Sequence, residues 1–319
     1  MLLDEIKQSG RPIVVSMSGG KDSTATGLYL RELEIEKTNP VYYAFCDTGW
    51  EHPELYQYLD DVIEPLFGPE FYRLKSKKYP GGMPDLVEKK GMFPSRKIRF
   101  CTQELKIFPI RDFMKETQAK HPDKAIPLNV VGIRAAESKA RSRMGEYEPG
   151  SILSGGKNSA PICDTWRPLI TWLVQDVIDI HTRHGIRPCP LYLRDNLPAQ
   201  RVGCWPCIMS RKDEIRSVAE TDPDRIVQIR NLEKKVTDNA RARHAKKRKY
   251  PDSPLFTATF FQSKGDDGSM WPIEKVVEWS KTAYGGRQYE LFVANDPAER
   301  GCQSWGLCDL PDHNGEFSE

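Results

Sequence analysis

Residues 16–23 read Ser16-Met17-Ser18-Gly19-Gly20-Lys21-Asp22-Ser23, and this stretch decides the fold. The run before it, Pro12-Ile13-Val14-Val15, is short, apolar and β-branched, which is typical of a buried parallel strand. After it, residues 24–33 carry apolar side chains at helical spacing. The sequence therefore predicts a strand, a turn containing two glycines, and a helix, in that order.

A strand-to-helix turn of this kind favours binding of an anion. Backbone N–H groups and the positive end of the helix converge there, and Gly19 and Gly20 let the backbone approach a phosphate closely. Hydroxyls are available from Ser16, Ser18 and Ser23, Lys21 can neutralise phosphate charge, and Asp22 could hold Mg²⁺. The Walker pattern Gly-x-x-x-x-Gly-Lys-Ser/Thr is absent. The alternative, an ordinary glycine-rich turn, is disfavoured because strand, motif and helix agree.

Composition is typical of a globular protein that works in the cytoplasm. Of the 319 residues, 39% are hydrophobic and 29% charged, and neither a membrane-length apolar run nor a secretory signal is seen. The net charge of +2 is too small to indicate a nucleic-acid partner by itself. For the eight cysteines, metal binding or redox chemistry is a better interpretation than a disulfide framework.

Further strands and helices alternate along the chain. Residues 40–49 form a predicted strand that ends at Asp47 and Thr48, and residues 129–133 form another that ends beside Gly132 and Arg134. Ligands bind at the carboxyl ends of such strands. Helices are predicted at 54–63, 105–117 and 174–184, and a mobile surface loop at 76–91. We therefore expect an α/β, doubly wound parallel sheet over residues 1–195 and a smaller, mainly helical region over 196–319.

Several motifs occur together in one order: Ser18 to Ser23, Asp47-Thr48-Gly49, Cys101 with Lys106, Gly132 to Ser138, and Pro168 to Trp172. As a set they resemble the phosphoadenosine phosphosulfate (PAPS) reductase family, within the adenine nucleotide α-hydrolase superfamily. The resemblance implies a loop that grips the β- and γ-phosphates of ATP while the α-phosphate is attacked and pyrophosphate leaves. It also implies that Asp47, Thr48, Gly132, Arg134 and Arg141 lie beside the nucleotide, and that Lys21, Asp22 and Ser23 are catalytic.

This chain departs from the sulfate reductases of the family at two places. Those reductases usually have a degraded loop, whereas here the Lys21-Asp22-Ser23 ending is complete. They also carry a catalytic cysteine in a Glu-Cys-Gly-Leu-His tail, whereas this tail reads Gly301-Cys302 through Cys308-Asp309. The resemblance therefore favours relatives that use ATP to incorporate sulfur into DNA or RNA, with a sulfur donor as partner. A PAPS-type oxidoreductase with a thiol reductant and a nucleotide-binding module without turnover are the alternatives.

Residues Cys204-Trp205-Pro206-Cys207 form a C-x-x-C motif, which by itself fits zinc, an iron–sulfur cluster or a redox pair. The family resemblance implies a [4Fe–4S] cluster bound by Cys101, Cys204 and Cys207. We expect the fourth ligand to be Cys308, or else Cys302, and Zn²⁺ or unmetallated thiols are the alternatives. The other cysteines, Cys46, Cys163 and Cys189, are expected to pack as small hydrophobic residues.

The stretch Arg241–Lys249 has six Lys or Arg among nine residues. It is either a solvated helix face or a phosphate-binding patch for a nucleic acid. His181 and His184 are predicted to lie at a surface or helix end rather than to bind a ligand. The sequence leaves oligomerisation open.

Overall fold

The computed structural model describes residues 2–150, 161–194, 198–246, 257–263, 265 and 268–282, with side chains as far as Arg243 in the third range. Six strands and eleven α-helices occur within these ranges. The strands are β1 (Ile13–Met17), β2 (Val41–Cys46), β3 (Phe71–Leu74), β4 (Leu128–Val131), β5 (Tyr147–Glu148) and β6 (Asp164–Trp166). The helices are α1 (Leu2–Ser9), α2 (Lys21–Glu32), α3 (Pro53–Tyr58), α4 (Glu64–Phe67), α5 (Gly82–Lys90), α6 (Phe100–Thr102), α7 (Phe108–Lys120), α8 (Val174–Arg183), α9 (Lys212–Thr221), α10 (Pro223–Lys246) and α11 (Ile273–Ser280).

The strands form one sheet in the order β3-β2-β1-β4-β6-β5, in which all neighbours are parallel except the β5–β6 pair. The predicted doubly wound α/β fold is therefore confirmed. The strand order reverses between β1 and β4, and such a switch point is where open α/β sheets bind ligands. The chain from β1 into α2 and the chain after β4 meet there.

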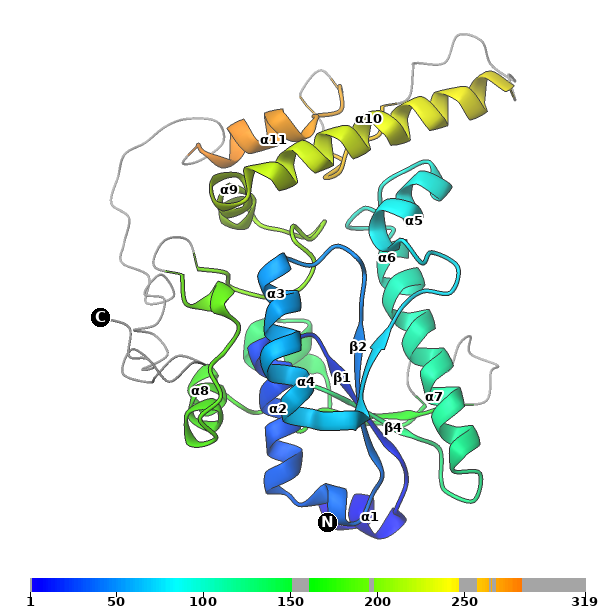
Figure 1. Ribbon diagram of the computed structural model, residues 1–319, viewed down its shortest axis with the longest axis vertical. Helices are drawn as coiled ribbons and strands as arrows, with labels where there is room; N and C mark the ends of the chain where they lie inside the picture. The colour runs from blue at the N-terminus through cyan, green and yellow to red at the C-terminus, as the bar shows by residue number, and fades with distance from the viewer. Residues whose placement is uncertain are drawn as a thin grey trace.

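Alternating side chains of the central strands face two helical layers. In β1, Ile13, Val15 and Met17 belong to a core with residues of α2 and α3, whereas Val14 packs with residues of α7. Figure 1 shows the same arrangement, with α2, α3 and α8 on one side of the sheet and α7 on the other. Because both faces are buried, the central strands β1 and β2 are apolar except for Ser16, which explains the apolar runs in the sequence.

Helices α9, α10 and α11 lie across the end of the molecule above α3 and α5 (Figure 1). One hydrophobic cluster joins α10 and α11 to α5 through Met83, Leu86, Val87, Ile229 and Val236. The predicted mobile loop at 76–91 is wrong, because residues 82–90 form α5 and three of its apolar side chains are buried in this cluster. No helix among the described residues has the length and apolar character needed to cross a membrane.

A close approach between β4 and α2 requires glycine at position 132. A Cβ atom at Gly132 would lie 2.5 Å from the Asp22 carbonyl oxygen and 2.6 Å from Thr26 Oγ1. We therefore expect Gly132→Ala to push the end of β4 away from α2 and to lower the free energy of unfolding by about 1–3 kcal/mol. Denaturant unfolding would measure this loss. Gly145→Ala is the matched control because its nearest neighbour is 3.5 Å away, and equal effects of the two variants would contradict the steric argument.

A second prediction concerns Glu233 on α10, which is buried and accepts hydrogen bonds from the backbone N–H groups of Phe260 (2.7 Å) and Ile273 (3.1 Å). Burial raises the pKa of this carboxyl to about 7. An acid whose pKa is raised on folding favours the folded state at low pH, and this contribution is lost as the pH rises from the unfolded pKa towards 7. One pKa unit corresponds to about 1.36 kcal/mol, so the loss is expected to be at most about 3 kcal/mol.

Glu233→Gln should therefore weaken the decline in unfolding free energy between pH 5 and pH 8. Denaturant unfolding at several pH values would measure the slope. Glu278→Gln, at an exposed acidic residue of α11, is the matched control. A wild-type slope in Glu233→Gln would show that this carboxyl does not titrate in the expected window.

Candidate nucleotide and thiol site

The turn between β1 and α2 is shaped by its two glycines and two of its serines. Gly19 has a φ of +69°, and a Cβ there would lie 2.5 Å from Leu55 Cδ1, so only glycine fits without strain. Ser23 Oγ accepts from the backbone N–H of Ser18 at 3.1 Å and donates to the Gly20 carbonyl at 2.9 Å. The loop is thus held by its own side chains, with α2 beginning at Lys21 directly after it.

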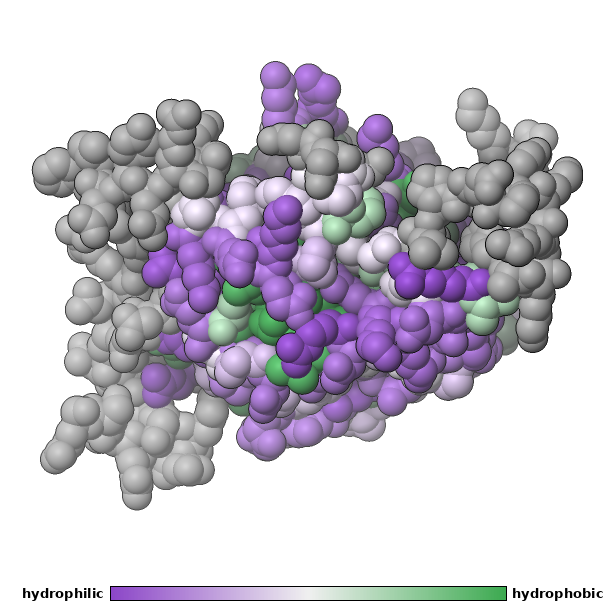
Figure 2. Space-filling view, turned by 90° about the horizontal axis from the view of Figure 1, so that it is seen from above, coloured by the Kyte–Doolittle hydropathy of each residue, from purple (hydrophilic) through white to green (hydrophobic). Residues whose placement is uncertain are grey.

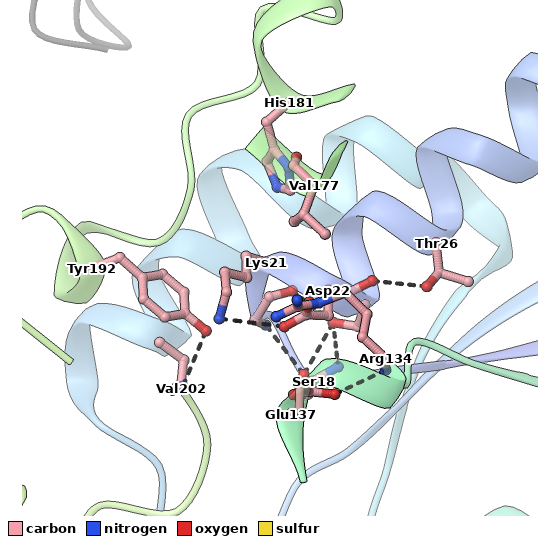
Figure 3. Close-up of polar contacts among 12 residues, drawn as sticks. Ser18, Lys21, Asp22, Thr26, Arg134, Glu137, Val177, His181, Tyr192 and Val202 are labelled. Carbon is pink, nitrogen blue, oxygen red and sulfur yellow. Dashed lines mark hydrogen bonds and ion pairs between the residues drawn. The ribbon is translucent and has the colours of Figure 1, made fainter. Parts of the chain in front are cut away.

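The end of β4 is attached to this loop by an ion pair. Arg134 Nε lies 2.5 Å from Asp22 Oδ1, and the two side chains are only 7% and 14% exposed. The second oxygen of Asp22, Oδ2, lies 3.4 Å from Lys21 Nζ. Glu137 accepts from the Arg134 backbone N–H at 2.9 Å and also pairs with Arg141. Figure 3 shows Lys21, Asp22, Arg134 and Glu137 gathered around the loop.

Because both oxygens of Asp22 face cations, this carboxylate does not fit the predicted role of direct Mg²⁺ ligand in the arrangement described. A hard cation needs oxygen lone pairs that are not already directed at ammonium or guanidinium groups. The geometry instead gives Asp22 the role of holding Lys21 and Arg134 beside the loop.

A pocket of about 520 Å³ opens above the loop at the switch point. Of the residues predicted to bind the nucleotide or act in catalysis, the following line it: Ser16, Ser18, Gly20, Lys21, Asp22, Ser23, Gly132 and Arg141. The others are near but do not line it. Gly19, within the loop, faces Leu55, and Arg134 is directed at Asp22. Asp47 and Thr48 are buried in the turn after β2, where Asp47 accepts from Tyr56 at 2.7 Å.

Tyr192 is a pocket residue to which sequence reasoning assigned no role. Lys21 Nζ lies 4.9 Å from the centre of its ring, and its hydroxyl accepts from the Val202 backbone N–H at 3.2 Å (Figure 3). A cation over an aromatic face is attracted by the ring quadrupole. Tyr192 therefore orients Lys21 and attaches the Gln200–Gly203 segment to the pocket. The only feature of the sequence that could have pointed to Tyr192 was the tripeptide Pro190-Leu191-Tyr192, which follows α8.

His181 was expected at a surface or helix end; it lies in the last turn of α8, but a surface position is wrong. It is completely buried in α8, and its Nδ1 lies 2.8 Å from the Val177 carbonyl. Burial lowers its pKa to about 4, so the imidazole is neutral at physiological pH. The side of α8 that carries His181 is packed in the core between α2 and α8. His184 is placed at the helix end as expected, where its Nε2 lies 2.8 Å from Glu32.

The C-x-x-C segment lies against the turn after β2. Glu51 and Cys204 form an antiparallel bridge, the Trp205 N–H donates to the Trp50 carbonyl at 2.8 Å, and Cys204 Sγ is 3.6 Å from Thr48 Oγ1. Burial raises the pKa of Cys204, although the neighbouring Lys106 ammonium opposes that effect. A smaller pocket of about 180 Å³ is lined by both thiols of the motif. It shares Lys106 and residues 200–203 with the pocket above the loop.

The predicted iron–sulfur ligands do not form a ligand set in the described part of the chain. Cys101, Cys204 and Cys207 pack around one hydrophobic cluster, and burial raises the pKa of Cys101, which favours the neutral thiol. Among the residues that the structure describes, no three or more His, Cys, Asp or Glu side chains form a group that could hold a metal ion. The thiols described do not fit a cluster by themselves, and Cys302 and Cys308 lie outside the described residues.

The remaining cysteines mostly follow expectation. Cys163 and Cys189 are buried, which confirms that they pack as small hydrophobic residues. Cys46 is only partly buried by surface area and lines the larger pocket, with its Sγ 3.5 Å from the Lys106 carbonyl. Burial of its sulfur raises its pKa to about 12, so it is a thiol rather than a thiolate.

Comparison with known proteins gives a family and several relatives of unassigned role. An uncharacterised 37.8 kDa protein of Escherichia phage 186 is 29% identical over 93% of this chain and 96% of its own length. An uncharacterised protein of Methanocaldococcus jannaschii is 27% identical over 67% of this chain and 39% of its own length. A crystal structure of PAPS reductase from Candida auris aligns with a TM-score of 0.43 and 20% identity, covering 60% of this chain and 81% of that one.

The model of the phosphoadenosine phosphosulfate reductase domain matches residues 12–210. This range includes every strand of the sheet, the glycine-containing loop and the C-x-x-C motif. Because the match spans more than half of the 319 residues, the chain belongs to the phosphoadenosine phosphosulfate reductase domain family.

Proposed function

We propose that this protein binds ATP in the pocket above the β1–α2 loop and directs an acceptor onto the α-phosphate, so that pyrophosphate leaves. The observation that carries the proposal is the complete loop from Ser18 to Ser23 at the switch point of the sheet, with Lys21 lining the pocket. In the reaction, a bond forms between the acceptor atom and the α-phosphorus. The bond from that phosphorus to the bridging oxygen breaks, and the electron pair leaves with pyrophosphate.

The loop would act mainly through position and charge. The backbone N–H groups at the start of α2 and the Lys21 ammonium would stabilise the negative charge that develops on the leaving pyrophosphate. Tyr192 and Asp22 hold Lys21 from two sides, which reduces the reorganisation needed when the nucleotide binds. Arg141, which lines the same pocket, is available for a further phosphate contact.

We further propose that the activated acceptor receives sulfur, so that the protein is a sulfurtransferase using a sulfur donor. Support comes from the smaller pocket, which is lined by Cys204 and Cys207 and shares Lys106 with the nucleotide pocket. Adenylylation creates a leaving group on the acceptor, and a sulfur nucleophile brought to these thiols would displace AMP from it.

The proposed reaction has no step that requires a metal cluster. Iron, sulfide and zinc analysis of anaerobically purified protein, with Cys101→Ser and Cys308→Ser compared, would test whether the tail completes a metal site.

Two alternative functions would give different products from the same protein. A PAPS-type reductase would release sulfite from an adenylyl sulfate in the presence of a dithiol and would not need ATP. A nucleotide-binding module would bind ATP without producing pyrophosphate. The complete Lys21-Asp22-Ser23 ending of the loop is the observation that favours ATP turnover over both.

The role of Lys21 can be tested by removing its charge. Lys21→Ala should lower ATP turnover by roughly a hundredfold or more, as is usual when a preorganised group that stabilises the transition state is removed. A coupled pyrophosphate assay would measure the rate. Lys37→Ala, an equal loss of charge at an exposed site before β2, is the matched control. Wild-type turnover in a folded Lys21→Ala protein would contradict the assignment of the loop.

The products identify the bond that breaks. We expect AMP and pyrophosphate, because the proposed attack is on the α-phosphate. Anion-exchange chromatography of the reaction mixture separates these products from ADP and phosphate. ADP formation that depends on Lys21 would mean that the loop supports attack on the γ-phosphate instead.

A further inference from the structure

The turn at residues 96–99 presents three cations to solvent in succession. Arg96, Lys97 and Arg99 are exposed, and among the described residues none of them has an ion-pair partner or a side-chain hydrogen bond. Between them, Ile98 is 60% exposed, which is unusual for a large apolar side chain. We call this the Arg96–Arg99 turn.

The turn is fixed by the residues that precede it. Phe93 is buried and its carbonyl accepts from Gln262 Nε2 at 2.5 Å. The Ser95 N–H donates to the Ile98 carbonyl at 3.0 Å, and the Ile98 N–H donates to Ser95 Oγ at 2.9 Å. Its three cations are therefore presented by a fixed backbone rather than by a free segment, which lowers the entropy lost when a partner binds.

Other cations close by in the chain differ from those of the Arg96–Arg99 turn because acidic residues neutralise them. Lys90 Nζ lies 3.1 Å from Glu104 Oε1, and Lys89 Nζ lies 2.9 Å from Asp85 Oδ2. Lys77 lies within 3.6 Å of both Asp112 and Glu116. Unlike these three lysines, the cations of the Arg96–Arg99 turn have no acidic partner among the described residues.

A second basic segment, far away in sequence, starts beside the end of α5. Arg243, near the end of α10, donates to the carbonyls of Glu88 and Lys89 at 3.0 Å each. These carbonyls end α5, which leads through Gly91 into the turn. Arg243 thus caps α5, and Arg241 donates to Thr257 at 3.4 Å. The two described arginines of the Arg241–Lys249 run therefore have partners within the protein, at Thr257 and at the end of α5.

The turn also leads directly to the chemical site. It runs into α6, which contains Cys101, and Lys106 five residues later lines both pockets. The face seen from above in Figure 2 is mainly hydrophilic, with hydrophobic residues gathered near its centre. A polymer of negative charges held by the turn would therefore contact the chain just before the segment that reaches the pockets at Lys106.

We propose that the Arg96–Arg99 turn binds the phosphate backbone of a single-stranded nucleic acid, which is the acceptor of the proposed reaction. Three unpaired cations in four residues match successive phosphates of a strand, and Ile98 offers an apolar contact to a base or sugar. The pockets lie within the protein, so a nucleotide that enters them must be unpaired, as duplex bases are inaccessible to recessed sites. The identity of the acceptor rests on the proposed function, but binding to the turn does not require ATP turnover.

Binding is tested with the full chain and a fluorescein-labelled 20-nucleotide single strand, followed by anisotropy over a range of salt concentrations. The triple variant Arg96→Ala/Lys97→Ala/Arg99→Ala should bind roughly tenfold or more weakly at 0.1 M salt. Its slope of log affinity against log salt should fall by up to about 2, since each phosphate contact to a single strand contributes about 0.7. The control is Lys37→Ala/Lys120→Ala/Lys124→Ala, three exposed lysines that precede β2 and β4 at the opposite edge of the sheet.

An unchanged affinity in the first triple variant, or an equal loss in both, would overturn the proposal. Tighter binding of a duplex of the same sequence than of the single strand would overturn the choice of partner. Hydrolysis of ATP to AMP and pyrophosphate, with water in place of the acceptor, should be unaffected by the triple substitution in the turn, whereas Lys21→Ala should lower it by roughly a hundredfold or more and leave strand binding intact. The two readouts therefore distinguish failure of this inference from failure of the proposed function.

Discussion

The ion pair between Arg134 and Asp22 is the interaction on which the site depends. It joins the end of β4 to the beginning of α2 across the point where the strand order reverses, and both side chains are largely buried. Removing one partner of a buried pair leaves an uncompensated charge, which typically costs about 3–5 kcal/mol. The absence of a side chain at Gly132 is what lets the two elements approach closely enough to form it. The Arg134–Asp22 ion pair thus holds the loop, the end of β4 and Lys21 together.

The C-terminal helices are attached to the sheet through the turn after β2. Trp50 is placed between Arg225, 4.6 Å from its ring centre, and Phe260, whose ring lies 5.8 Å away. Its Nε1 donates to the Pro206 carbonyl at 3.1 Å, and Arg225 Nη2 donates to the Glu51 carbonyl at 3.1 Å. The same turn carries Glu51, which lines the pocket above the loop and pairs with Cys204, so the C-x-x-C segment and that pocket contact the same turn.

Burial and charge oppose one another around the thiols. Loss of water raises the pKa of Cys46, Cys101 and Cys204, whereas Lys106 favours the thiolate of Cys204. A negative charge on that sulfur would in turn raise the pKa of Lys106. Sulfur chemistry at this place would therefore depend on Lys106, the cation that borders both pockets. Residues 200–203 also line both pockets, so they border the same space as Lys106.

The sequence was enough to predict the β1–loop–α2 unit, the parallel sheet and eight of the residues that line the pocket above the loop. These features depend on local order, since a β-branched run, two glycines and an amphipathic helix allow few other structures. Tertiary structure alone decided that residues 82–90 form a buried helix, that His181 is buried and that Arg243 caps α5. Each of these depends on a partner more than 40 residues away in the chain, such as α10 for α5. Local composition, which was rich in Lys, Pro and Gly around α5, could not reveal a hydrophobic face completed by so distant a segment.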